Sequence, residues 1–288
     1  MSDSQYAVIY DLHSHTTASD GRLTPQELVH RAHEMRVGTL AITDHDSVAA
    51  IPAAREEIAR AGLPLTLVNG VEISTLWENH EIHIVGLNID IAHPTMTALL
   101  EEQKARRQQR GQMIAERLEK ARIPRRLGRG AADWRTVAPS PAAILPVFWW
   151  RPAMRKNMAE VFKKYLARGK TGYVPPQWCT IKQAIDVIHH SGGKAVIAHP
   201  GRYDLSAKWL KRLLAHFSEQ GGDAMEVAQC QQAPHERAQL ATLAVQFGLL
   251  ASQGSDFHQP CAWIELGRKL WLPAGVEGVW HSWEAAAE

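Results

Sequence analysis

Short apolar runs alternate along this chain with longer stretches in which apolar residues recur every three or four positions. The short runs predict buried strands, and the longer stretches predict amphipathic helices. We expect strands at residues 7–10, 38–43, 65–68, 71–73, 81–86, 194–198, 224–228 and 249–252. We expect helices at residues 24–36, 47–60, 94–121, 158–166, 180–190, 209–220 and 234–247.

The order of these elements predicts an α/β fold. Strands that alternate with helices form a mostly parallel sheet, and this many units can close into a barrel. A capping box from Thr24 to Glu27, with Pro25 at the first helical position, marks where the first helix begins. Barrel enzymes build their active sites at the carboxyl ends of the strands, so the residues that follow each predicted strand are the ones to inspect.

Composition narrows the class of protein. A chain of 288 residues, 45% hydrophobic and 22% charged, is long enough for a full barrel or for two ordinary domains. A net charge of +2 neither requires nor excludes a nucleic-acid partner. The three cysteines are far apart, which argues against a disulfide framework and favours a reducing compartment. The first residues show neither a signal peptide nor a membrane span, so we expect a cytoplasmic protein with no membrane partner.

Two histidines stand at alternate positions directly after the first predicted strand. His13 and His15 are expected to point to the same side, because residues two apart in an extended chain do so. Imidazole is the commonest protein ligand of transition metals. Asp11 lies on the same side and is predicted to hold the second N–H of one ring. The alternative is a turn with exposed histidines that bind nothing.

The other predicted strands decide between these two interpretations. They also end in, or contain, histidine or acidic residues, namely Asp44, His45, Glu72, His83, His199, Asp256 and His258. Buried charges and imidazoles are costly unless they are paired or coordinated, so this recurrence predicts a site for several metal ions. Glu226 also ends a strand and could face that site. We interpret the histidines outside these positions as ordinary, namely His30, His33, His93, His189, His190, His216, His235 and His281.

The same motifs resemble those of the PHP (polymerase and histidinol phosphatase) family of metal-dependent phosphoesterases. They are Asp11–His15, Thr43–His45, Gly70–Glu72, His83, Ala198–Pro200 and Gly254–His258. The resemblance implies a distorted seven-stranded (β/α) barrel, formed by residues 1–93 and 177–288, with a small helical inserted domain at 94–176. It also implies ligands for up to three divalent ions. These are His13, His15, Glu72 and Asp256 for the first, Glu72, His83 and His199 for the second, and Asp20, His45 and His258 for the third.

The resemblance also implies an activity and a substrate class. It is closest to members of the family that degrade 5′-phosphorylated RNA in the 5′→3′ direction, process ribosomal RNA and remove the 3′-phosphate from nucleoside 3′,5′-bisphosphates. Mn²⁺ is the metal we expect, although Fe²⁺, Zn²⁺ or Mg²⁺ would suit the same ligands. Arg202 is predicted to bind a substrate phosphate, and His199 or His258 to position or protonate the leaving group. We find no indication of an obligate protein partner.

Two other functions remain open at this point, and a third is disfavoured. The chain could be a phosphatase for a small metabolite such as histidinol phosphate, or a metal-binding module without catalysis. Zinc amidohydrolases also begin with His-x-His after a strand. Their bridging ligand is usually a lysine, and here Glu72 takes that place, since no lysine ends a suitable strand.

Residues 125–157 differ in composition from the chain around them. This stretch is rich in Arg, Pro, Ala and Trp, contains no Glu, and has four prolines that exclude a long helix. The resemblance implies an Arg-x-His-x-Ala pattern for substrate binding in this part of the chain, and the pattern is absent. Our hypothesis is that two compensating frameshifts replaced the native segment. The predicted ligands would remain intact, because none of them lies in this stretch. The insert would be poorly ordered, with exposed apolar residues and weaker substrate binding.

Overall fold

A computed structural model describes residues 8–121 and 162–284 of the chain. The chain divides into two compact units, Met1–Thr97 with Cys179–Glu288, and Ala98–Trp178. The hypothesis about residues 125–157 therefore concerns a segment outside the described residues.

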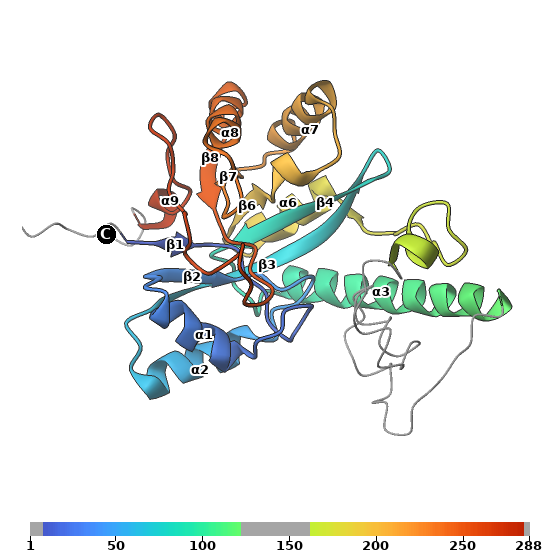
Figure 1. Ribbon diagram of the computed structural model, residues 1–288, viewed down its shortest axis with the longest axis horizontal. Coiled ribbons are helices and arrows are strands. Elements are labelled where there is room, and N and C mark those ends of the chain that lie inside the picture. Colours follow the sequence, from blue (N-terminus) through green and yellow to red (C-terminus); the bar gives the residue numbers. More distant parts are fainter. Residues whose placement is uncertain (1–7, 122–161, 285–288) are drawn as a thin grey trace, which may run out of the picture. The chain divides into compact units, whose positions relative to one another are not determined.

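The larger unit is built around a sheet that curls into a nearly closed barrel (Figure 1). Its strands are β1 (Tyr10–Asp11), β2 (Thr39–Ile42), β3 (Thr66–Trp77), β4 (His80–Leu87), β5 (Cys179–Thr180), β6 (Lys194–Ile197), β7 (Ala224–Ala228) and β8 (Leu250–Gln253). Seven of them follow one another in the order β1-β2-β3-β4-β6-β7-β8, and β5 pairs with β3 outside this path. The predicted seven-stranded α/β barrel is confirmed.

The barrel is mixed rather than parallel throughout. Strand β4 runs antiparallel to both β3 and β6, whereas the other pairs are parallel. The reversal follows from the tight β3–β4 hairpin, in which Glu78 and Asn79 adopt positive φ angles of 45° and 67°. The hairpin turns the chain back beside β3 without the crossover helix that a parallel connection needs.

Backbone hydrogen bonds between the two ends of the barrel path bring the chain's first and last motifs together. The N–H of Leu12 donates to the carbonyl of Gln253 at 3.1 Å, and that of His15 donates to Phe257 at 2.9 Å. The N–H of Asp256 donates in turn to the carbonyl of His13 at 2.9 Å. The segments after β1 and β8, which carry predicted ligands, therefore run side by side.

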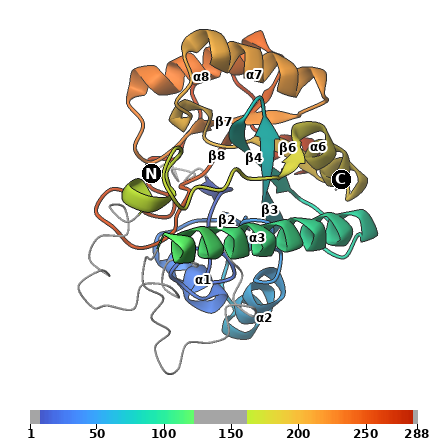
Figure 2. The ribbon, with the colours of Figure 1, turned by 90° about the vertical axis from the view of Figure 1, so that its right-hand side faces the viewer.

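Helices cover the outer faces of the barrel. They are α1 (Pro25–Glu34), α2 (Ile51–Ala61), α6 (Ile181–His190), α7 (Ala207–Glu219) and α8 (Pro234–Gln246), with the short helices η2 (Pro200–Arg202) and α9 (His281–Glu284). Helices α7 and α8 lie together on one side of the barrel and α1 and α2 on the other (Figures 1 and 2). The predicted capping box of α1 is present, with the Thr24 side chain accepting from the Glu27 N–H.

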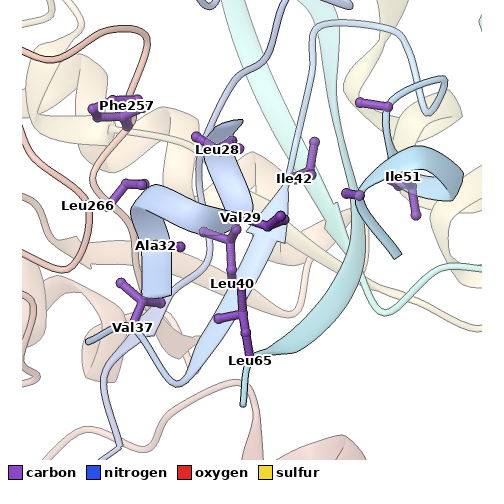
Figure 3. Packing of buried hydrophobic residues seen from close by; sticks show 12 residues of the cluster. Leu28, Val29, Ala32, Val37, Leu40, Ile42, Ile51, Leu65, Phe257 and Leu266 are labelled. Carbon is purple, nitrogen blue, oxygen red and sulfur yellow. The ribbon is translucent and has the colours of Figure 1, made fainter. Parts of the chain in front are cut away.

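A hydrophobic core joins α1 and α2 to β2 (Figure 3). Leu28 and Val29 of α1 pack with Leu40 and Ile42 of β2, and all four side chains are buried. Each fully buried side chain of this size contributes about 1.5–3 kcal/mol relative to exposure. This packing holds β2 in place, and the loop after β2 carries His45.

Three sequence predictions are corrected by the structure. The first strand was expected at 7–10 but is formed by Tyr10–Asp11, and Val8 is 57% exposed, because pairing with β2 begins only at Tyr10. The separate strands expected at 65–68 and 71–73 are one long strand, β3, since its hairpin partner β4 pairs along it from Gly70 to Trp77. In the helix expected at 158–166, the described part Phe162–Leu166 is the π-helix η1.

The smaller unit contains most of the long helix α3 (Pro94–Lys120). Ile114 and Leu118 of α3 form a small core with Leu166 and Val174. The Arg110 side chain donates to the Val174 carbonyl at 3.0 Å, which ties the segment after η1 to the helix. Within the described ranges, we find no helix whose length and apolar character would let it cross a membrane.

Candidate metal centre

His13 and His15 point toward one another, as their alternate positions lead one to expect. Both side chains are fully buried, and their Nε2 atoms lie 3.1 Å apart. Oδ1 of Asp256 lies 3.3 Å from Nε2 of His13 and 3.2 Å from Nε2 of His15. The first and last motifs of the chain thus meet at three ligand-type side chains.

The donors to the Asp11 carboxylate are backbone N–H groups and not a histidine ring, contrary to the sequence prediction. Its carboxylate accepts the backbone N–H of Ser255 at 2.8 Å and that of Gly267 at 2.9 Å. Those donors lie beside β1 only because the barrel closes. The histidine contact is made instead by Glu226 of β7, whose Oε1 lies 2.5 Å from Nδ1 of His13. The only sequence signal for Glu226 was its position in a predicted strand, which did not indicate that it would contact His13.

Glu72 lies at the centre of the site. It stands in the middle of β3, not at a strand end as predicted, because the β3–β4 hairpin continues beyond the barrel. Its carboxylate is 1% exposed and has five imidazoles within 3.3 Å. These belong to His13, His15, His45, His83 and His199.

Asp20 joins three of the histidines at the opening of the site. Its carboxylate lies 3.3 Å from Nε2 of His258, 3.5 Å from Nε2 of His45 and 3.6 Å from Nδ1 of His15. Its side chain is 21% exposed and that of His258 is 34% exposed. This part of the site is therefore accessible to solvent, in contrast to the buried part around His13.

Asp44 holds the loop that carries Asp20. The buried Asp44 carboxylate accepts the backbone N–H of Thr16 at 2.8 Å, its hydroxyl at 2.7 Å and the Ser19 hydroxyl at 2.6 Å. The motif Thr43–His45 was the only sequence signal for Asp44, and it did not indicate which loop the carboxylate would bind.

The structure brings all the predicted ligand residues into one contiguous set, here called the histidine–carboxylate cluster. Its members are His13, His15, Asp20, His45, Glu72, His83, His199, Asp256 and His258. Within it, three groups have ligand atoms all within 4.8 Å of one another, namely His15–Asp20–His45–His258, His13–His15–Asp256 and His45–Glu72–His83. The histidines interpreted as ordinary occur in none of these groups.

Unpaired polar atoms in the cluster fit bound cations. Nδ1 of His45 and Oε2 of Glu72 lie 3.0 Å apart, yet neither atom makes a hydrogen bond of good geometry to a described residue, and the buried Nδ1 of His199 makes none either. Leaving such atoms without a partner is costly. A cation near them would supply the missing interaction, and the mixed nitrogen and oxygen donors suit Mn²⁺, Fe²⁺ or Zn²⁺.

The proton affinities of the cluster show how strongly it attracts positive charge. Burial would lower the pKa of His13, but the carboxylates of Glu226, Glu72 and Asp256 outweigh it and raise the pKa well above its usual value. Burial likewise opposes the shifts of two other histidines, yet carboxylates raise the pKa of His83 to about 10 and that of His258 to about 9.

The carboxylates respond in the opposite sense. Burial alone would raise the pKa of Glu72 and of Asp256, but the surrounding imidazoles lower both well below their usual values. Without metal, protonated His13, His83 and His258 therefore lie beside the ionised carboxylates of Glu72 and Asp256, whereas burial lowers the pKa of His15. Metal ions would replace those protons.

Two members of the cluster have backbone conformations that favour glycine. His199 has φ 31° and Asp256 has φ 52°. A left-handed backbone is uncommon outside glycine and persists where surrounding contacts hold it, often at functional sites. Here the backbone N–H groups of His199 and Asp256 are held by Glu226 and by the His13 carbonyl.

Arg202 lies beside the cluster at the end of η2. Its guanidinium donates from Nη1 to Oδ2 of Asp256, and its side chain is 38% exposed. One edge of the guanidinium is thus bound to a predicted ligand. The N–H groups on the other guanidinium nitrogen atoms would be the donors to an anion in the solvent-accessible part of the site.

Comparisons with known proteins agree with this geometry. The profile of the PHP domain matches residues 11–126. The chain is 72% identical over 290 residues to the 5′-3′ exoribonuclease Rnm of Salmonella typhimurium, covering 99% of this chain and 97% of that protein. It is 39% identical over 280 residues to the 3′,5′-nucleoside bisphosphate phosphatase of Chromobacterium violaceum, with 96% of each chain covered. Among solved structures, an amidohydrolase from Chromobacterium violaceum with bound sulfate and no metal has a TM-score of 0.80 and 36% identity, again with 96% of each chain covered.

Proposed function

Because the chain belongs to the PHP family of metal-dependent phosphoesterases, we propose that it is an exoribonuclease that releases nucleotides from 5′-phosphorylated RNA in the 5′→3′ direction. The Salmonella relative is named for this activity and matches the chain over nearly its whole length. The more distant Chromobacterium relative is named a 3′,5′-nucleoside bisphosphate phosphatase. Hydrolysis of the 3′-phosphate of nucleoside 3′,5′-bisphosphates is therefore the second reaction that we propose for the same site.

The observation that carries the proposal is the environment of Glu72. One buried carboxylate with five imidazoles within 3.3 Å would be a costly arrangement in a protein that binds no cation there. His83 and His199 approach its Oε1, at 2.9 and 3.2 Å, whereas His13, His15 and His45 approach its Oε2. These contacts on both oxygens support the proposal that Glu72 would be a ligand shared by two ions.

The remaining members of the cluster complete the ligand sets. His13, His15 and Asp256 would join Glu72 on the first ion, and His83 and His199 would join it on the second. Asp20, His45 and His258 would hold a third ion, and these three side chains lie at the solvent-accessible opening. Mn²⁺ is the ion that we propose, with Fe²⁺, Zn²⁺ and Mg²⁺ as the alternatives that elemental analysis of the purified protein would distinguish.

Bound divalent ions would offset the charge of a phosphate ester and lower the pKa of water. The chain's own residues bind and orient the substrate beside them. Arg202 would donate to a phosphate oxygen while it keeps its bond to Asp256. His258 and His199 are the alternatives for a side chain that positions or protonates the leaving oxygen, and His258 is the more exposed of the two.

We also propose that residues 94–176 form the inserted domain expected from the family, and that the enzyme acts in the cytoplasm, with ribosomal RNA among its substrates. The division of the chain into two compact units, with boundaries at Thr97/Ala98 and Trp178/Cys179, supports the first of these statements. Accumulation of ribosomal RNA with extended 5′ ends in cells that lack the gene would support the last.

A product assay tests the proposed function. The purified protein with Mn²⁺ should convert a short 5′-phosphorylated RNA to mononucleotides from its 5′ end. It should also release phosphate from a nucleoside 3′,5′-bisphosphate. The same RNA with a 5′-hydroxyl should be a poorer substrate, because the proposed contact with Arg202 would be lost. The variant His30→Asn is a matched control, since His30 pairs with Glu57 outside the cluster.

Each alternative function has a distinct result in this assay. Rapid hydrolysis of histidinol phosphate with no action on RNA would replace our proposal by a small-metabolite phosphatase. Stoichiometric metal binding with no hydrolysis of any phosphate ester would indicate a metal-binding module without catalysis.

A further inference from the structure

We propose that Glu226 is a positioning residue that orients His13 and His199, two predicted ligands of different metal ions. The proposal rests on the metal binding described under the proposed function, and it is independent of the identity of the RNA substrate. Glu226 belongs to β7, is 1% exposed and is not a member of the histidine–carboxylate cluster.

One oxygen of Glu226 determines which nitrogen of His13 is free. Oε1 lies 2.5 Å from Nδ1 of His13, and because a carboxylate can only accept, Nδ1 must carry the hydrogen. In the neutral ring this leaves a lone pair on Nε2. That atom faces His15, Glu72 and Asp256 at 3.1 to 3.3 Å. Glu226 thus selects the tautomer in which His13 can bind a metal ion at the centre of the cluster.

The other oxygen of Glu226 holds the backbone of His199. Oε2 accepts the His199 N–H at 2.7 Å and the side-chain amide of Gln229 at 3.0 Å. His199 has a left-handed backbone, with φ 31°, which a non-glycine residue adopts only when other contacts hold it. From this conformation Nε2 of His199 reaches Oε1 of Glu72 at 3.2 Å. The bond from Glu226 therefore stabilises the turn that aims His199 at its proposed ion.

Glutamine at position 226 would keep the shape of the side chain but not its function. A carboxylate offers two accepting oxygens, whereas an amide offers one oxygen and an NH₂ group. If the NH₂ faced His13, Nδ1 would have to accept and the proton would move to Nε2, which blocks metal binding. If it faced the His199 N–H, two donors would meet. Either orientation disrupts one of the two predicted ligands.

Isothermal titration calorimetry, in which Mn²⁺ is added to the metal-free protein, tests this proposal. We expect Glu226→Gln to weaken Mn²⁺ binding about 10- to 100-fold. Glu265→Gln is the matched control, because Glu265 is also buried and also accepts three N–H groups. Its donors are Nε and Nη2 of Arg31 and the backbone of Leu266, none of which belongs to the cluster. The control should bind Mn²⁺ like the native protein.

Double variants separate positioning from a general loss of structure. If Glu226 acts through His13, the effect of Glu226→Gln should be clearly smaller in a His13→Asn background. It should keep its full size in a His45→Asn background, since Glu226 makes no contact with His45 among the bonds described here. Native Mn²⁺ affinity in Glu226→Gln, an equal loss in Glu265→Gln, or strictly additive effects with His13→Asn would overturn the proposal.

A measurement on the native protein covers the case in which Glu226→Gln does not fold. Nitrogen-15 NMR of the Zn²⁺-loaded protein should show a histidine Nδ1–H that is far downfield and slow to exchange, as a short buried bond to a carboxylate requires. Absence of any such signal would contradict the proposal. None of these measurements uses RNA, so they still test the role of Glu226 if the protein binds metal but does not hydrolyse RNA. A native protein that binds neither Mn²⁺ nor Zn²⁺ would overturn both proposals.

Discussion

A β carbon added to Gly254 would lie 2.3 Å from the β carbon of His13. It would also lie 2.8 Å from the His13 nitrogen and 3.1 Å from its α carbon, so the clash involves the backbone and a flexible side-chain end cannot relieve it. The segment after β8 thus approaches the segment after β1 so closely that only glycine fits at position 254. The position of His13 depends on this approach.

We expect Gly254→Ala to displace His13 and to reduce activity about 100-fold while the barrel remains folded. The matched control is Gly201→Ala, because a β carbon there would meet only Leu240 Cδ1, at an ordinary 3.6 Å. Steady-state kinetics with Mn²⁺ and a thermal melt of each variant provide the test. Native activity in Gly254→Ala would show that the segment around His13 accommodates a β carbon at position 254 without loss of function.

Glu72→Gln is expected to reduce turnover by roughly 1,000-fold, and His45→Asn by roughly 10- to 100-fold. Glu72 contacts five imidazoles and is the residue that we propose as a bridge between two ions, whereas His45 is paired with two carboxylates, those of Glu72 and Asp20. Single-turnover rates at saturating Mn²⁺ would compare the two variants. Equal residual activity in two folded variants would argue against the bridging role of Glu72.

Replacing Arg202 is expected to affect substrate binding more than chemistry. Arg202→Gln removes a charged donor from the accessible side of the site and should raise KM about 10- to 100-fold. Arg202→Lys keeps the charge but loses the planar fork, so it should restore only part of the affinity. Arg212→Gln is the control, since Arg212 pairs with the exposed Glu78 on the hairpin. An unchanged KM in Arg202→Gln would exclude the proposed phosphate contact.

The stability of the metal-free protein should fall as pH rises above neutrality. The pKa values of His258, about 9, and His83, about 10, lie above the ordinary 6.5, so their stabilising contribution is complete below pH 6.5 and is lost as pH rises through 9 to 10. Glu72 and Asp256 have lowered pKa values, so their contribution is present above their ordinary 4.5 and 3.8 and is lost in acid.

Thermal melts of the metal-free protein should therefore show a maximum near pH 5 to 6.5 and a decrease of about 5 °C or more by pH 9. With saturating Mn²⁺ the maximum should move to higher pH, because metal ions and protons compete for the same imidazoles. A melting temperature that increases between pH 6.5 and 9 without metal would contradict the raised histidine pKa values.

Removing metal should abolish activity and lower stability together. An ion present at 100 times its dissociation constant stabilises the folded state by about 2.7 kcal/mol. For a chain of 288 residues, that corresponds to a shift in Tm of roughly 4–5 °C for each ion. Chelation followed by stepwise addition of Mn²⁺ should restore hydrolysis and Tm in parallel. Full activity after exhaustive chelation would rule out the metal-dependent mechanism.

Local signals in the sequence were sufficient for most helices and for the close approach of the first two histidines. The Thr24 capping box begins α1 where predicted, because a cap involves only residues three positions apart. His13 and His15 lie two positions apart, and their Nε2 atoms meet at 3.1 Å. The alternation of strands and helices was enough to predict the α/β class, since periodicity within each segment reflects which face it buries.

Contacts between distant segments could not be predicted in this way. The sequence indicated that Asp11 would hold a histidine ring. Because the barrel closes, Asp11 instead accepts two backbone N–H groups from the C-terminal segment. The His13 ring is bound by Glu226, 213 positions away along the chain. The β3–β4 hairpin likewise made one long strand of two predicted short ones and placed Glu72 in its middle. The sequence by itself determined which residue types are available and roughly where most strands and helices lie. The tertiary structure decided which side chains meet, because that depends on how the barrel closes and not on the spacing of residues along the chain.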